Sequence, residues 1–63
     1  MMTKDQWIKE AEERITNNIG FINEVNNMIG SDWSRHRSRM ESSVRENVFL
    51  TNGIKLLKER END

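Results

Sequence analysis

A chain of 63 residues allows a single domain, which we expect to span 1–63, and a chain this short buries only about 60% of the surface that its unfolded form exposes. The lack of Cys and the single His exclude disulfides and a structural zinc site as sources of stability, which leaves self-association. The net charge of −1 divides into −3 over residues 1–32 and +2 over residues 33–63, and this opposition favours antiparallel packing of the two halves.

The first predicted helix spans about 3–29. Thr3 and Gln6 form a capping box, in which a hydroxyl and a Gln three residues later satisfy free amides of the first turn. Isoleucine then recurs every seven residues, as in the seam of a coiled coil, at Ile8, Ile15, Ile22 and Ile29. Asn18 is polar within this seam, so we expect it to fix the register or the oligomeric state.

The predicted turn centres on Gly30. We expect Gly30 to follow the last turn of the first helix in a left-handed conformation. Ser31, Asp32 or Ser34 can then cap the second helix. Four residues or fewer between the helices leave little choice beyond an antiparallel hairpin, so the predicted fold is all-α.

The second predicted helix spans about 32–60. Its apolar residues predict one broad inner face, made of Trp33, Met40, Val44, Val48, Leu50, Ile54 and Leu57. Asn52-Gly53 is a turn signal, but Leu50 and Ile54 keep helical phase across it, so we expect one continuous helix. Both helices would then have about 27 residues and a length of roughly 40 Å.

Further apolar residues lie outside the two inner faces. Phe49 and Leu56 point away from Met40, and the first helix has an apolar edge. Two helices cannot cover this much apolar surface, so we expect a helical-bundle homo-oligomer, either a dimer or a larger ring. The candidate interface consists of Trp7, Phe21, Met28, Trp33, Phe49 and Leu56.

Catalytic motifs are not recognisable in the chain. His36 has no nucleophile in a suitable spacing, and the serines between residues 34 and 43 lack a strand–turn–helix elbow. We therefore expect a protein that binds rather than catalyses, with no metal and no cofactor.

The most informative segment contains three arginines, Arg35, Arg37 and Arg39, near the start of the second helix, where the helix macrodipole favours acids instead. Guanidinium forks, hydroxyl groups and a nearby aromatic ring suit a phosphate-bearing ligand. The plainer interpretation is a solvated cationic face that pairs with the acidic helix of the same or a neighbouring subunit. The candidate ligand-binding residues are Arg35, Ser38, Arg39, Ser42 and Arg45.

The second helix resembles the helical-hairpin domain of phage anti-defence sponges, which sequester cyclic nucleotides of bacterial CBASS and Thoeris immunity. That pattern comprises a Ser-Arg opening, hydroxyl positions, a Leu, an acid, an apolar pair and an Ile-bearing end. The matching residues are Ser34-Arg35, Ser38, Ser42, Val44, Glu46, Phe49-Leu50 and Ile54. The match covers about 25 of the 63 residues and departs from the pattern at Met40, Asn47 and Leu50. The resemblance implies an oligomeric, non-enzymatic nucleotide binder.

Two other binding functions remain open. The Phe49 and Leu56 stripe could bind a host protein, as in a small inhibitor or adaptor. The architecture is also similar to small dimeric RNA-binding hairpins that regulate plasmid copy number, although a net charge of −1 argues against a broad RNA-binding surface. No apolar run approaches the ~20 residues that span a bilayer, and residues 1–5 do not resemble a signal peptide, so we expect no membrane association and a cytoplasmic location.

Overall fold

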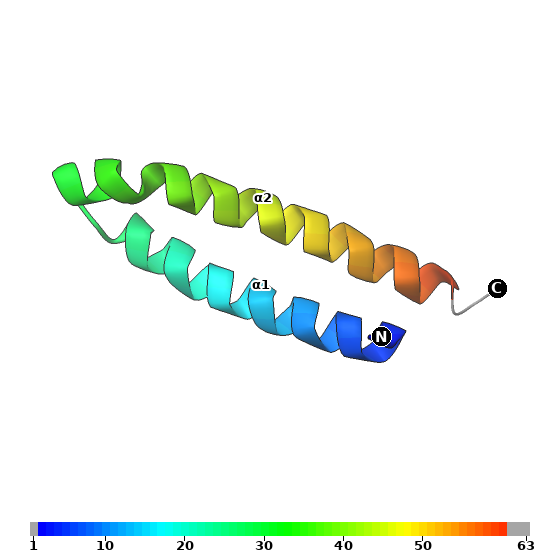
Figure 1. Cartoon of the computed structure of the whole chain (residues 1–63). Helices are drawn as coiled ribbons and strands as arrows, with labels where there is room; N and C mark the ends of the chain where they lie inside the picture. The colour runs from blue at the N-terminus through cyan, green and yellow to red at the C-terminus, as the bar shows by residue number, and fades with distance from the viewer. Residues whose placement is uncertain (1, 61–63) are drawn as a thin grey trace.

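The computed structural model describes residues 2–60, which form two antiparallel helices joined by a short connection (Figure 1). α1 spans Lys4–Asn26 and α2 spans Ser31–Arg60. The hairpin is elongated, with extents of 50 × 17 × 17 Å. The start of α1 and the end of α2 lie at the end opposite the connection. The predicted all-α hairpin is confirmed, while the outermost parts of the predicted domain, Met1 and residues 61–63, lie outside the described residues.

The start of α1 follows the predicted cap. The Thr3 hydroxyl accepts a hydrogen bond of 3.2 Å from the backbone amide of Gln6, and the Thr3 carbonyl accepts one of 2.9 Å from the amide of Trp7. Asp5 lies in the first turn, where a negative charge interacts favourably with the helix dipole and stabilises the helix.

The end of α1 differs from the prediction. α1 stops at Asn26, and Asn27 closes it with its amide 3.2 Å from the carbonyls of both Asn23 and Glu24. Asparagine has a weak helix propensity, and its accumulation at this end explains the early stop. Ile29, the last member of the isoleucine repeat, therefore lies outside the helix and is 86% exposed.

Gly30 is left-handed as predicted, with φ of 67°, but it stands at the start of α2 rather than next to the end of α1. Its carbonyl accepts the amide of Ser34 at 3.2 Å, the first turn of α2. Ser31, Asp32 and Ser34 lie inside this helix, so none of them is the residue before it. The helices consequently have 23 and 30 residues, and the predicted equal lengths are wrong.

α2 continues without a break through Asn52 and Gly53, as the apolar phase predicted. The reason for a glycine there is the indole of Trp7. A Cβ atom at position 53 would lie 2.6 Å from Cη2 of Trp7, far inside van der Waals contact. Gly53 thus allows the Trp7 ring to lie directly on the backbone of α2.

The buried side chains belong to α1. Ile8, Ala11 and Val25 are 8%, 4% and 0% exposed, whereas none of the described residues of α2 is buried. On the inner side of α2, half-buried residues face α1: Met40, Leu50, Ile54 and Leu57. The predicted broad inner face was too wide. At 3.6 residues per turn, Val44 and Val48 lie about 120° and 160° around the helix from Leu50, and both are exposed.

Three contacts, spaced seven residues apart on each helix, join the helices along one side. We call this side the closed flank, and its residue pairs are Trp7 with Gly53, Arg14 with Glu46 and Phe21 with Arg39. The opposite side has an open groove between the helices. We call it the aliphatic flank, after its residues Ile15, Ile19, Ile22, Val44 and Val48.

Candidate functional site: an arginine stripe on α2

The candidate ligand-binding residues lie together on the outer surface of α2. Their spacing of three or four residues places them along one side of a helix. All five are exposed. We call this set the arginine stripe: Arg35, Ser38, Arg39, Ser42 and Arg45. Phe49 and Leu56 continue the same line toward the end of α2 and expose 69% and 60% of their surface.

Arg39 is the member of the stripe that contacts α1. Its guanidinium carbon lies 5.4 Å from the centroid of the half-buried Phe21 ring. Such a cation–π contact contributes about 0.5–1 kcal/mol at an exposed site. The Arg39 head is therefore positioned by Phe21 on the closed flank, and its N–H groups form no hydrogen bond within residues 2–60.

Arg35 and Arg45 have no interaction partner within residues 2–60. Arg37, between them in sequence, differs because it lies on another side of α2. Its Nε donates to Glu41 Oε1 at 3.1 Å, and its guanidinium lies 5.5 Å from the ring centroid of Trp33. Of these arginines, Arg35 and Arg45 thus keep their full hydrogen-bonding capacity for a ligand.

The plainer interpretation of the arginines, pairing with the acidic helix of the same chain, is not what the hairpin shows. In the described part of the chain, no carboxylate of α1 forms an ion pair with the stripe. An ion pair between the helices, Arg14 with Glu46, has the opposite polarity, with the cation on α1. Within residues 2–60, the carboxylates of α1 therefore do not neutralise the arginines of the stripe.

The middle of the closed flank holds a polar cluster around Glu46. Arg14 Nε donates to Glu46 Oε1 at 2.6 Å, and Asn18 Nδ2 donates to the same oxygen at 2.7 Å and to Asn47 Oδ1 at 2.8 Å. The hydrogen bonds from Arg14 and Asn18 lower the pKa of the Glu46 carboxyl, and the Glu46 contact raises the pKa of Arg14. Asn18 therefore bridges the helices, as expected of a residue that fixes register.

Glu46 and Asn47 were not identified from the sequence as the partners of Asn18. A signal for them exists, because positions 43, 46, 47, 50, 54 and 57 have the spacing of one inner helical face. The apolar residues of α2 alone do not identify this face, because the residues at its centre, Glu46 and Asn47, are polar.

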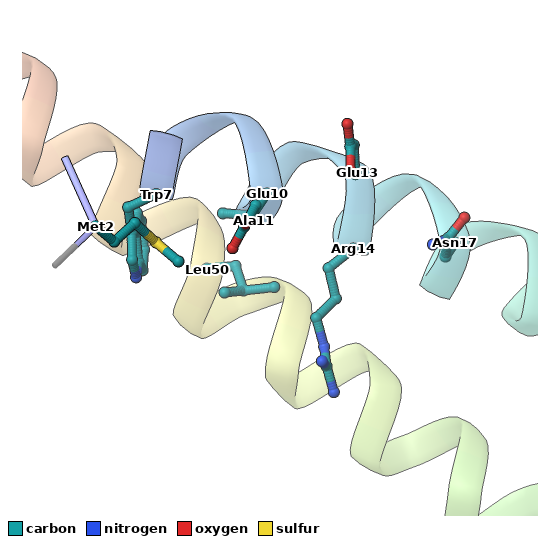
Figure 2. Close-up of a pocket in the computed structure, with 8 residues that line it drawn as sticks. All are labelled: Met2, Trp7, Glu10, Ala11, Glu13, Arg14, Asn17 and Leu50. Atoms are coloured by element: carbon teal, nitrogen blue, oxygen red, sulfur yellow. The ribbon is translucent and has the colours of Figure 1, made fainter. Parts of the chain in front are cut away.

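The hollows of the hairpin lie away from the arginine stripe. Figure 2 shows one of them, where Trp7 and Leu50 face each other between the helices, Arg14 reaches toward α2 and Glu13 points away. A second hollow lies near the open end, lined by Trp7, Gly53 and Leu56 among others. No stripe residue lines these two hollows or the groove of the aliphatic flank, and all five stripe residues are exposed.

The predicted interface residues divide into two groups. Four are half-buried within the hairpin itself: Trp7, Phe21, Met28 and Trp33. Phe49 and Leu56 are exposed on the outer side of α2 and remain free to contact another molecule. His36 has a local contact, because its Nδ1 donates to the Asp32 carbonyl at 2.9 Å.

Within residues 2–60, no group of three or more His, Cys, Asp or Glu side chains could hold a metal ion. Neither described helix combines the length and the hydropathy that crossing a bilayer requires. Comparison with protein-family models, with curated proteins and with solved structures found no match for this chain.

Proposed function

We propose that the protein is a non-enzymatic, self-associating hairpin that binds a phosphate-bearing ligand through the arginine stripe. The observation that carries this proposal is the exposure of Arg35 and Arg45 without an acidic partner in the described chain, with Ser38 and Ser42 between them. Guanidinium groups bind phosphate through two parallel hydrogen bonds, and hydroxyls add further donors.

The dimensions of the stripe restrict how such a ligand binds. Arg35 and Arg45 are ten residues apart, which is about 15 Å along the helix axis. A single phosphate contacts one of these arginines but not both. A ligand with two or more phosphates, such as the cyclic nucleotide that the sponge resemblance implies, contacts the stripe at several points. The stripe is an exposed surface of one helix, so the ligand would bind along it and keep part of its own surface in contact with solvent.

Calorimetry with a panel of cyclic di- and trinucleotides tests the proposal. Each charge-assisted hydrogen bond contributes about 1.5–3 kcal/mol, so the Arg35→Ala/Arg45→Ala variant should bind more than tenfold more weakly. The matched control is Lys55→Ala/Lys58→Ala, which removes the same charge from the same helix outside the stripe and should bind like the unmodified protein. Absence of binding by every nucleotide, or equal weakening by both variants, would contradict the proposal.

A short RNA belongs in the same panel because its phosphates also repeat along a line. RNA binding through counterion release weakens steeply with salt. Strong salt dependence with RNA, together with no affinity for cyclic nucleotides, would assign the stripe to RNA.

A protein partner is the second candidate function, favoured by the 69% and 60% exposure of Phe49 and Leu56. Such exposed apolar side chains in one line can anchor a partner helix or strand. A host protein that is retained by the unmodified chain and lost on Phe49→Asp, while the oligomer persists, would support this function. Dissociation of the oligomer by Phe49→Asp would instead show that the stripe is structural.

A further inference from the structure

The aliphatic flank is an apolar surface, contributed by both helices, that the hairpin leaves uncovered. Ile19, Val44 and Val48 are 48%, 44% and 57% exposed. Together with Ile15 and Ile22 they line the groove on the side away from the closed flank. A continuous apolar surface of this kind marks a site of association.

The exposed area of the hairpin is too large for a compact monomer. Its accessible surface is 5199 Å². A folded monomer of 7.5 kDa is expected to expose about 4,250 Å², so the excess is about 950 Å². A standard protein interface removes about 800 Å² from each partner. One interface with a second molecule therefore removes the excess.

The charges of the two flanks decide which surface can meet its own copy. In a two-fold dimer each patch faces the identical patch of the partner, so a patch whose charges all have one sign meets charges of the same sign. The groove of the aliphatic flank is lined by uncharged residues alone: Ile15, Ile19, Ile22, Val44, Asn47, Val48, Thr51 and Asn52. The arginine stripe would instead bring arginine toward arginine, which is unfavourable.

The position of the groove also suits two-fold pairing. Ile15 is the central residue of α1, and Val44 and Val48 lie on either side of the centre of α2. A second hairpin placed across this central groove covers it evenly and leaves neither end of the patch exposed.

We propose that a second copy of this chain docks on the aliphatic flank, forming a four-helix bundle whose shared core contains Ile15, Ile19, Ile22, Val44 and Val48. This inference deepens the proposed function, on whose self-association it rests, by naming the surface. It differs from the expectation that Phe49 and Leu56 form the oligomer interface. The dimer leaves both arginine stripes on the outside, available for ligand.

Adjacent residues of α2 provide the test. Val48 lies on the aliphatic flank and Phe49 on the outer side, so Val48→Asp and Phe49→Asp place the same charge one residue apart. Sedimentation equilibrium should find twice the 7.5 kDa chain mass for the unmodified protein and for Phe49→Asp, and a shift toward the chain mass for Val48→Asp. A monomeric unmodified protein across micromolar concentrations, or dissociation by Phe49→Asp but not by Val48→Asp, would overturn the proposal.

A second measurement does not depend on the folding of a charged variant. The chain has no Cys, so Val48→Cys and Phe49→Cys each introduce a unique thiol, and Cys is a small apolar residue that the interface tolerates. A short bis-maleimide should link two chains efficiently at position 48 and poorly at position 49. The reverse preference would overturn the proposal.

Both measurements are made without ligand, so their outcome is independent of the nucleotide panel. A dimer of the proposed form that binds no phosphate-bearing ligand would leave the interface standing and remove the proposed ligand. Ligand binding by a protein that associates through another surface would do the opposite.

Discussion

The closed flank and the aliphatic flank are made by the same two helices but join them in different ways. On the closed flank an indole rests on a glycine, an arginine meets a glutamate and an arginine lies over a phenyl ring. On the aliphatic flank the branched side chains line a groove that remains open. The closed flank thus specifies how the two helices of the chain pair, whereas the aliphatic flank keeps apolar surface exposed in the hairpin.

Truncation of an isoleucine in the aliphatic flank is expected to have the largest effect on stability. Ile15→Ala should lower the free energy of unfolding by about 2 kcal/mol or more, as is usual for a core isoleucine once the partner covers it. Ile29→Ala is the matched control, since Ile29 occupies the same heptad position in the sequence but is 86% exposed. Denaturant unfolding at one protein concentration should show a lower free energy of unfolding for Ile15→Ala and almost no change for Ile29→Ala. Equal losses would mean that the isoleucine repeat acts as one seam.

Alanine at Gly53 tests the Trp7 contact of the closed flank. Gly20→Ala and Gly53→Ala both gain about 1 kcal/mol of helix propensity. A Cβ at position 20 meets nothing within 4 Å, so Gly20→Ala should stabilise the protein. At position 53 the indole must move, at a cost of about 1–3 kcal/mol, which offsets or reverses the gain. Thermal unfolding that gives both variants the same increase would contradict the close approach of Trp7.

Asn18 tests the polar middle of the closed flank. Asn18→Ala removes two hydrogen bonds to α2, whereas Asn17→Ala removes an exposed neighbour and gains the same helix propensity. The difference between the two variants therefore isolates the hydrogen bonds, and we expect about 1 kcal/mol in chemical denaturation. A difference near zero would assign the register of the helices to packing alone.

The pH dependence of stability tests the contribution of Glu46 to the closed flank, and it is the smallest of the expected effects. Because folding lowers the pKa of Glu46, its contribution is present above the ordinary value of 4.5 and is lost as the pH falls through the lower, folded value. The unfolding free energy should thus fall on acidification below about pH 4.5, and Glu46→Gln should reduce this slope. Asn18→Ala, which removes the second hydrogen bond to the carboxylate, should give an intermediate slope. An unchanged slope in Glu46→Gln would exclude this contribution.

Local signals predicted most of the fold. The Thr3 cap, the left-handed Gly30 and the apolar phase across Gly53 each depend on a few neighbouring residues, and each was found. The end of α1 was missed because Ile29 fits the heptad repeat, while the helix had already been weakened by asparagines. Periodicity reports which face a residue would occupy in a helix, but it does not report where the helix stops.

Contacts between the helices could not be predicted in the same way. The shared exposed side of the stripe residues follows from spacing alone, because all of them belong to one helix. The contact of Arg39 with Phe21 and the cluster around Glu46 depend on the alignment of two helices, which no short segment specifies. Val44 and Val48 were assigned to the inner face because an apolar arc on α2 is wider than the strip that one partner helix covers.

Heptad repeats are vulnerable to slippage, since sliding one helix by seven residues restores the same apolar pattern. The contacts of the closed flank act against this error. A slip in one direction would place Trp7 beside Glu46 and Arg14 beside Arg39, and a slip in the other would place Phe21 beside Glu46. Each displaced pairing places a ring beside a carboxylate or a cation beside a cation. The three different contacts are therefore all favourable together in only one register of the two helices.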